Sequence, residues 1–189
     1  DGARVLCHPF SANGEGGGMD DADDVELIKS LASLESKHFL VRREWNGSEP
    51  RYDMLETIRE FGRDMLGEAG ELTEMRNRHA DHATSMAIAF REHVGGLEPG
   101  FWLDRFEREI DEFRAALAWL LQGGEDGAMK ALTLANRLDY YWDWRGHAKE
   151  GQRWITAALD KISDHETLEC AIGFLNLGNL EASDLERIR

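Results

Sequence analysis

Three histidines in one predicted helix are the side chains best suited to binding a metal ion. His79 and His82 are three residues apart and so share a helical face, with Asp81 beside them and His93 later in the helix. This spacing can supply two ligands of a zinc site, which needs further donors converging on the ion. No cysteine or carboxylate is clearly placed on the same face. We therefore expect an interfacial pair of histidines and no metal site.

Carboxylates are the next candidates, because a pair of them can act as general acid and base. Along one predicted helix they flank the apolar positions and alternate with arginines, which is typical of a solvated, ion-paired face. The residues are Glu107, Glu109, Asp111 and Glu112, interleaved with Arg105, Arg108 and Arg114. No Ser-His-Asp or Cys-His arrangement is suggested locally, although such groups can meet in space. We expect no catalytic residues and a chain that is not an enzyme.

A glycine-rich stretch, residues 13–18, raises the question of phosphate binding. A phosphate-binding loop ends in Gly-Lys-Ser/Thr and lies between a strand and a helix. Neither feature is found here, and an acidic run follows at Asp20–Asp24. We expect a flexible leader over residues 1–23 and no bound cofactor.

The densest aromatic cluster is the strongest candidate for binding a partner. It comprises Tyr140, Tyr141, Trp142 and Trp144, with Trp154 across a predicted turn. Four aromatic side chains within five residues cover more than half of a helix, so at least one should face outward. Exposed aromatics beside arginines are typical of binding surfaces. We predict the partner-binding residues Tyr141, Trp144, Arg145 and Arg153; the alternative is that the cluster serves only packing between repeats.

These groups would be carried almost entirely by helices. Apolar residues at helical spacing predict helices over residues 25–37, from Leu55 to Gly67 or Gly70, and over 72–94, 101–122, 126–145 and 148–162. A last pair begins near His165, and Arg189 falls early in its second helix. In the helix over 101–122 the apolar spacing 3-4-3-4-3 is that of a helix packed nearly parallel to a neighbour. Its members are Leu103, Phe106, Ile110, Phe113, Leu117 and Leu120.

A β-hairpin is expected between the first two helices. Residues 39–47 and 51–54 form its strands, around an Asn-Gly-Ser-Glu-Pro turn. Arg42, Arg43 and Arg51 could touch DNA as the wing of a winged helix does, but nearby carboxylates offset their charge. We expect the hairpin to pack against an adjoining domain, and direct DNA contact is the alternative.

The last two helix pairs look like one unit used twice. Leu138, Trp142 and the turn at 145–147 can be laid on Leu175, Asn179 and residues 182–184, with an offset of about 37 residues. Tetratricopeptide repeats recur about every 34 residues. The pattern predicts a stack of antiparallel helix pairs, an α-solenoid, in which each pair needs neighbours to bury its faces.

Composition narrows the classes of partner. The 189 residues have a net charge of −15, which disfavours nonspecific attraction to phosphate backbones. The two cysteines, Cys7 and Cys170, lie far apart, and a buried thiol is expected for Cys170. No apolar run approaches the ~20 residues that span a bilayer, and no signal peptide is visible. We expect a cytoplasmic location and no membrane partner.

Several segments together resemble a known class of regulator. They are Leu31–Leu34, Arg51–Phe61, Trp102–Phe106, Phe113–Trp119, Trp144–His147 and Glu150–Trp154. In order and approximate spacing, the segment from Val25 to Ile162 resembles the signal-transducing ATPases of the STAND class. Within that class it is most similar to bacterial transcriptional regulators of the LuxR and AfsR types.

The resemblance implies a domain organisation. Residues 24–69 would be part of a winged-helix subdomain with its hairpin, and residues 70–189 the start of a tetratricopeptide-like sensor array. In the wider family a histidine after the wing contacts the phosphate of a bound nucleotide. Here Met54-Leu55-Glu56 stands at that position, and leucine cannot donate a hydrogen bond. No nucleotide contact is therefore carried over to this chain.

The fold we expect is mainly α, with one hairpin. The function we expect is that of a non-catalytic regulatory and sensor module, binding a protein partner or small effector ligand and packing against an adjoining ATPase core. No direct nucleic acid contact is expected. Two alternative functions remain. A DNA-binding winged-helix transcription factor would need a basic recognition helix. A small helical enzyme would need a deep pocket with converging titratable groups.

Overall fold

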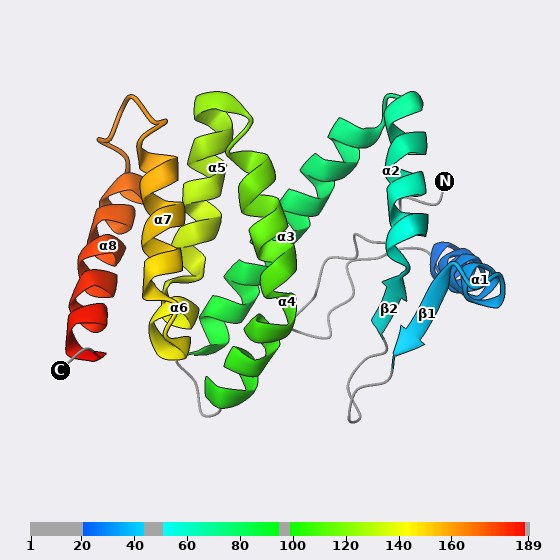
Figure 1. Cartoon of the computed structure of the whole chain (residues 1–189), viewed down its shortest axis with the longest axis horizontal. Coiled ribbons are helices and arrows are strands. Elements are labelled where there is room, and N and C mark those ends of the chain that lie inside the picture. The colour runs from blue at the N-terminus through cyan, green and yellow to red at the C-terminus, as the bar shows by residue number, and fades with distance from the viewer. Residues whose placement is uncertain (1–20, 44–50, 95–98, 188–189) are drawn as a thin grey trace. The chain divides into compact units, whose positions relative to one another are not determined.

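The computed structural model describes residues 21–43, 51–94 and 99–187 (Figure 1). Within these ranges the chain is mainly helical with one two-stranded antiparallel sheet, as predicted. The elements are α1 (Asp21–Ser36), β1 (Leu40–Arg43), β2 (Arg51–Met54), α2 (Glu56–Glu68), α3 (Leu72–Val94), α4 (Pro99–Leu120), α5 (Gly124–Arg137), α6 (Asp139–Arg145), α7 (Ala148–Leu159) and α8 (Leu168–Arg187). The glycines of the expected leader and the hairpin turn lie outside the described residues. The chain divides into two compact units, residues 1–75 and 76–189.

The first unit contains the predicted hairpin. Leu40 pairs with Met54 and Arg43 with Arg51 in an antiparallel register. Leu40 is the buried residue of its strand, and α1 packs against β1. Across the two strands Arg43 forms an ion pair with Asp53. The positive charge of this arginine is therefore offset on the hairpin itself.

Helix α2 has an apolar face with little to cover it. The sequence places Leu55, Ile58, Phe61 and Met65 along one side, as expected for an amphipathic helix. No residue of α2 is buried, and Phe61 and Met65 are largely exposed. This apolar face is thus open over the described residues.

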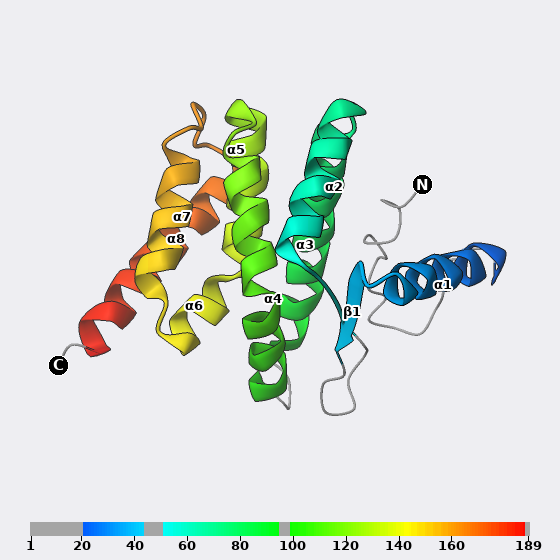
Figure 2. The ribbon, with the colours of Figure 1, turned by 45° about the vertical axis from the view of Figure 1, so that its right-hand side comes forward.

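The second unit holds the main hydrophobic core. All six residues of the predicted seam in α4 are buried, which confirms that helix and its inward face. Helices α5, α7 and α8 pack pairwise, and successive members run antiparallel (Figures 1 and 2). The thiol of Cys170 is free and buried between them, as predicted. Among the described helices, none has the length and apolar character to cross a bilayer.

The predicted helix over residues 126–145 is in fact two helices. Leu138 interrupts it with φ −96° and ψ 0°, and its N–H donates to the carbonyl of Ala135, three residues back. Leu138 and Trp142 are both fully buried, so the apolar periodicity runs through the break unchanged. A pattern of apolar spacing therefore gives no sign of it.

The end of the second repeat also differs from the prediction. Residues 182–184, expected to form a turn, lie inside α8, which continues to Arg187. In the first repeat Gly146 ends α6 with φ 79°, a left-handed conformation that glycine adopts at little cost. Asp184, which lies 38 residues after Gly146, is not a glycine, and the helix continues past it. The pattern of burial also corrects the predicted offset of about 37 residues, because it would pair the buried Leu138 with the exposed Leu175. An offset of 38 residues instead pairs buried residues with buried residues. The pairs are Leu132 with Cys170, Ala135 with Gly173, Leu138 with Asn176, and Trp142 with Leu180.

A glycine permits a close approach of three helices in this core. Gly151 in α7 faces the indole of Trp142 in α6 and the side chain of Leu180 in α8. A Cβ added at Gly151 would lie 2.4 Å from Cε3 of Trp142 and 2.9 Å from Cδ1 of Leu180. Cores packed at crystal-like density have no room for such an atom. Three helices thus meet at a position where only glycine fits.

A partly buried ion pair joins α4 to α7. The Arg114 guanidinium donates from Nε and Nη2 to the two carboxylate oxygens of Glu150, at 2.7 and 2.8 Å. The indole Nε1 of Trp154 also donates to Glu150, at 3.3 Å. The hydrogen bond from Arg114 lowers the pKa of Glu150, against the opposing effect of burial. The carboxylate is therefore held in its charged form.

We predict that Gly151→Ala destabilises the second unit. The added methyl group must displace the Trp142 indole or Leu180, and overpacking a core costs about 1–3 kcal/mol. Thermal and urea unfolding followed by tryptophan fluorescence would measure the loss. The matched control is Gly178→Ala in α8, where a Cβ meets nothing within 4 Å, so the free energy of unfolding should rise by roughly 0.5–1 kcal/mol. Equal effects at the two positions would contradict the packing described.

We also predict an acid-dependent loss of stability traceable to Glu150. Because its pKa is lower in the folded chain than the ordinary 4.5, its contribution is present above pH 4.5 and declines as the pH falls through the folded value. Comparing Glu150→Gln with the natural chain across pH 3–7 would isolate this part of the acid response. The difference in unfolding free energy should shrink toward low pH, and a constant difference would exclude the linkage.

Candidate functional site

A groove of about 590 Å³ runs across three helices of the second unit. Helices α3, α5 and α8 line it together with the first residue of α6. The lining residues are Ile88, Arg91, Glu92, Asn136, Arg137, Asp139, Ile172, Leu175, Asn176 and Asn179. Helices α5 and α8, which pack against each other, form two of its walls. Sequence spacing did not reveal it, because its residues come from three segments far apart in the chain.

Two buried asparagines form the polar base of this groove. Asn136 Nδ2 donates to the main-chain oxygen of Glu169 at 2.9 Å and to its carboxylate at 3.0 Å. Asn136 Oδ1 accepts a hydrogen bond from Asn176 Nδ2 at 3.3 Å. Buried amides are costly unless bonded, so these contacts fix both side chains and tie α8 to α5. Asn179, one turn further along α8, is exposed and makes no side-chain hydrogen bond to the described residues.

Three of the four charged residues that line the groove form ion pairs. Arg91 Nε donates to Asp139 at 3.0 Å, and Arg137 Nη2 donates to Glu169 at 3.2 Å. Each arginine is thereby placed by a carboxylate on a neighbouring helix. The groove consequently presents amides, these paired charges and the exposed carboxylate of Glu92, flanked by the exposed aliphatic side chains of Ile88 and Leu175.

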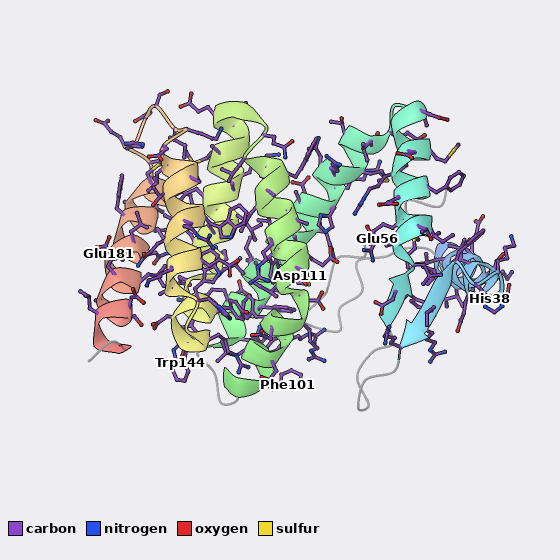
Figure 3. All side chains as sticks on the ribbon, in the orientation of Figure 1. His38, Glu56, Phe101, Asp111, Trp144 and Glu181 are labelled. Atoms are coloured by element: carbon purple, nitrogen blue, oxygen red, sulfur yellow. The ribbon has the colours of Figure 1, made fainter. Side chains whose placement is uncertain are left out.

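Trp144, a predicted partner-binding residue, is exposed and lies beside this groove. It is 55% exposed and stacks on Tyr140, with ring centroids 5.2 Å apart. The Arg91 guanidinium lies over the other aromatic of this pair, 5.5 Å from the centroid of Tyr140. Figure 3 shows Trp144 projecting from the end of α6. Arg91 thus connects the groove to an exposed aromatic platform.

Tyr141 does not lie on that surface. It is fully buried, and its hydroxyl donates to Glu107 at 2.9 Å. Burial, reinforced by the hydrogen bond to Glu107, raises the pKa of this phenol. The inside of the helix turn therefore takes Tyr141 and Trp142, and the outside takes Tyr140 and Trp144. Tyr141 is therefore a packing residue that a partner cannot contact.

The two predicted arginines are exposed but lie on different helices. Arg145 ends α6 and pairs with Asp104 and Glu107 of α4. Arg153 lies on the exposed side of α7. Of the four predicted residues, only Trp144 borders residues that connect to the groove.

The histidine pair of α3 makes a protein contact. His79 Nε2 lies 2.8 Å from Glu112 Oε2 of α4. Burial lowers the pKa of His82, and the neighbouring His79 adds to this, against the opposing effect of Glu109 and Glu112; the lowered pKa favours the neutral imidazole. Over the described ranges, no cluster of three or more His, Cys, Asp or Glu side chains could hold a metal ion.

Comparison with known proteins identifies related regulators. Over 145 residues the chain is 32% identical to "Putative HTH-type transcriptional regulator Rv0890c" of Mycobacterium tuberculosis (strain ATCC 25618 / H37Rv). The same identity holds for "Putative HTH-type transcriptional regulator Mb0914c" of Mycobacterium bovis (strain ATCC BAA-935 / AF2122/97). In each case the match covers 77% of this chain and 16% of the relative. No family model and no solved structure matches the chain.

We predict that the buried and exposed asparagines respond differently to mutation. Asn136→Ala removes the donor to Glu169 and leaves the Asn176 amide without its acceptor, which should cost about 1–3 kcal/mol of stability. Asn179→Ala, on the exposed turn, should leave the free energy of unfolding unchanged within about 0.5 kcal/mol. Urea unfolding of both variants measures this. A tolerated Asn136→Ala would show that the amide network does not hold α8 to α5.

Proposed function

We propose that this chain is a non-catalytic regulatory segment of a transcriptional regulator, in which the helical repeats bind a protein segment or a small effector. The observation that carries the proposal is the groove over α3, α5 and α8, with its preset amides and aliphatic walls. The similarity to proteins named as HTH-type transcriptional regulators supports the regulatory context.

The chemistry of the groove favours a ligand with amide-like polar groups. A carboxamide offers one acceptor and two donors, which match the C=O and N–H groups of a peptide or of a small heterocycle. Asn179 has these groups available, while Ile88 and Leu175 can cover apolar parts of the ligand. A volume of about 590 Å³ lies in the range of small-molecule sites. Trp144 and Tyr140 extend the surface with an aromatic platform.

The first unit would connect this sensor to a switch. By the resemblance to STAND-class regulators, the hairpin and α2 belong to a winged-helix subdomain adjoining an ATPase core. The open apolar face of α2, with Phe61 and Met65, is suited to packing against such a core. Ligand binding would then act by rigid-body movement of the repeats, biased toward whichever state the ligand prefers. The location we infer for such a regulator is cytoplasmic.

A DNA-binding winged-helix factor is the second candidate, favoured by the name of the relatives. The helix before the hairpin, α1, would have to read DNA. Helix α1 carries Lys29 against five acidic residues, Asp21, Asp23, Asp24, Glu26 and Glu35, and the whole chain has a net charge of −15. Long-range repulsion from phosphate works against this candidate.

We predict that a ligand selected for this chain binds through the groove. The natural chain would be panned against a random peptide library. In parallel, a metabolite panel would be screened by thermal shift, and labelled duplex DNA would be tested by gel shift. A selected peptide or metabolite should bind Asn179→Leu at least tenfold more weakly, since the replacement removes an exposed amide from the lining. Isothermal titration calorimetry gives both dissociation constants.

The matched control is Thr156→Leu, which places the same side chain on an exposed position of α7 outside the groove. Its affinity for the selected ligand should equal that of the natural chain. Ligands that bind Asn179→Leu and the natural chain equally would refute the groove as the site. Tight, sequence-specific binding to duplex DNA at moderate salt would instead favour the second candidate.

A further inference from the structure

A second cavity, of about 350 Å³, lies between α3, α4 and α5. We call it the hydroxyl pocket, and its lining residues are Asp81, Thr84, Ser85, Leu120, Lys130 and Thr133. On α3 Thr84 lies one turn before the groove residue Ile88, and on α5 Thr133 lies one turn before the groove residue Arg137. Helices α3 and α5 run in the same direction (Figure 1). The hydroxyl pocket and the groove therefore follow one another along the same two helices.

The three hydroxyl groups that line this pocket all donate their protons to the helix backbone. Thr84, Ser85 and Thr133 each donate to the main-chain oxygen four residues earlier, at 2.8, 3.0 and 3.1 Å. A hydroxyl carries a single proton but also lone pairs. With the proton committed, each oxygen offers a ligand only an acceptor. The pocket thus presents three neutral acceptors in addition to the carboxylate of Asp81.

The charges of the pocket favour a cationic ligand. Lys130 Nζ lies 3.9 Å from a carboxylate oxygen of Asp81, and the two side chains are 63% and 68% exposed. An ion pair this long and this exposed contributes little stability, so a cation of the ligand can replace the lysine beside Asp81. The net charge of −15 attracts cations from a distance. An anion would need donors, which the committed hydroxyls do not supply.

The remaining wall of the pocket suits an alkyl stem. Leu120 is 6% exposed and is the apolar member of the lining. Lysine and arginine side chains place their methylene groups against such surfaces while their charged ends reach polar groups. A guanidinium carries several N–H donors and no acceptor, which complements a site made of acceptors.

We propose that the hydroxyl pocket binds a basic side chain, arginine in preference to lysine, of a protein segment lying in the groove. The inference rests on the proposed function, and of its two classes of ligand it selects the protein segment. From Asp81 to Glu92, α3 advances roughly 16 Å, a length that an extended chain covers in about five residues. One short segment can therefore occupy both sites, whereas a free alkyl cation would fill the pocket alone.

Titration of n-butylguanidinium into the isotope-labelled 189-residue chain, followed by NMR, tests the pocket by itself. Amide signals around Thr84 and Thr133 should shift, and neither the neutral isostere n-butylurea nor inorganic phosphate should shift them. The double variant Thr84→Val, Thr133→Val removes two acceptors without changing the charge, and should weaken binding at least fivefold. The control Thr156→Val, at an exposed position of α7, should bind like the natural chain. Circular dichroism verifies that each variant is folded.

Peptides test whether the pocket and the groove take the same segment. Acetylated hexapeptide libraries with arginine fixed at each position in turn are compared with libraries carrying citrulline, the neutral analogue of arginine. At one terminal position arginine should raise the affinity at least tenfold, and the double valine variant should abolish this preference. Asn179→Leu should weaken binding of both libraries and keep the preference for arginine.

The possible failures separate this proposal from the groove itself. Shifts spread evenly over the surface, preferential binding of phosphate, or hexapeptides that bind equally with arginine and citrulline would overturn the hydroxyl pocket and leave the groove as a binding site. So would a preference for arginine that survives the double valine variant. Hexapeptides that never bind, with n-butylguanidinium still bound near Thr84 and Thr133, would refute both the segment as the source of the cation and the groove as a peptide site.

Discussion

The second unit depends on the contact between the Trp142 indole and the backbone of Gly151. α6 is a helix of seven residues, too short to hold its place through its own hydrogen bonds. The indole, fully buried, fixes it against α7, and Leu180 brings α8 to the same point. With α6 fixed, the outer side of the same turn presents Tyr140 and Trp144 in a fixed stack. The exposed aromatic platform is therefore a consequence of how its buried neighbours pack.

Polar contacts between the helices add to this packing. Asn136 reaches across from α5 to Glu169 and Asn176 of α8, and Arg114 reaches from α4 to Glu150 of α7. Each contact joins two helices that are not consecutive in the chain, and it satisfies groups that burial would otherwise penalise. The asparagines also supply the polar base of the groove. One set of side chains thus serves both the cohesion of the repeats and the surface that we propose as a binding site.

The sequence predicted the regular parts of the fold well because they follow from local periodicity. The seam of α4, the bounds of α3 and the two strands of the hairpin all come from apolar spacing and turn residues. The break at Leu138 was missed because a single residue in a tight turn leaves the buried positions in phase. Tyr141 was assigned to the wrong side of its helix, since four aromatics in five residues do not reveal which of them face inward.

The groove could not be predicted from the sequence, for a different reason. Its three walls come from segments around residues 90, 137 and 176, and no spacing rule connects them. Its asparagines carry no signal either, because an asparagine in a helix more often lies at the surface. Only the stacking of α3, α5 and α8 brings these amides together.

The uncovered state of α2 has a consequence for its local stability. An isolated helix of 13 residues is marginal in water, and most helices in proteins owe their stability to the burial of one face. Because α2 buries none of its side chains, little free energy separates its folded form from a frayed one. Its amide protons should accordingly exchange early, long before those of α5 or α7. A neighbouring domain that covers Phe61 and Met65 would supply the missing burial, so that docking and helix order become a single coupled event.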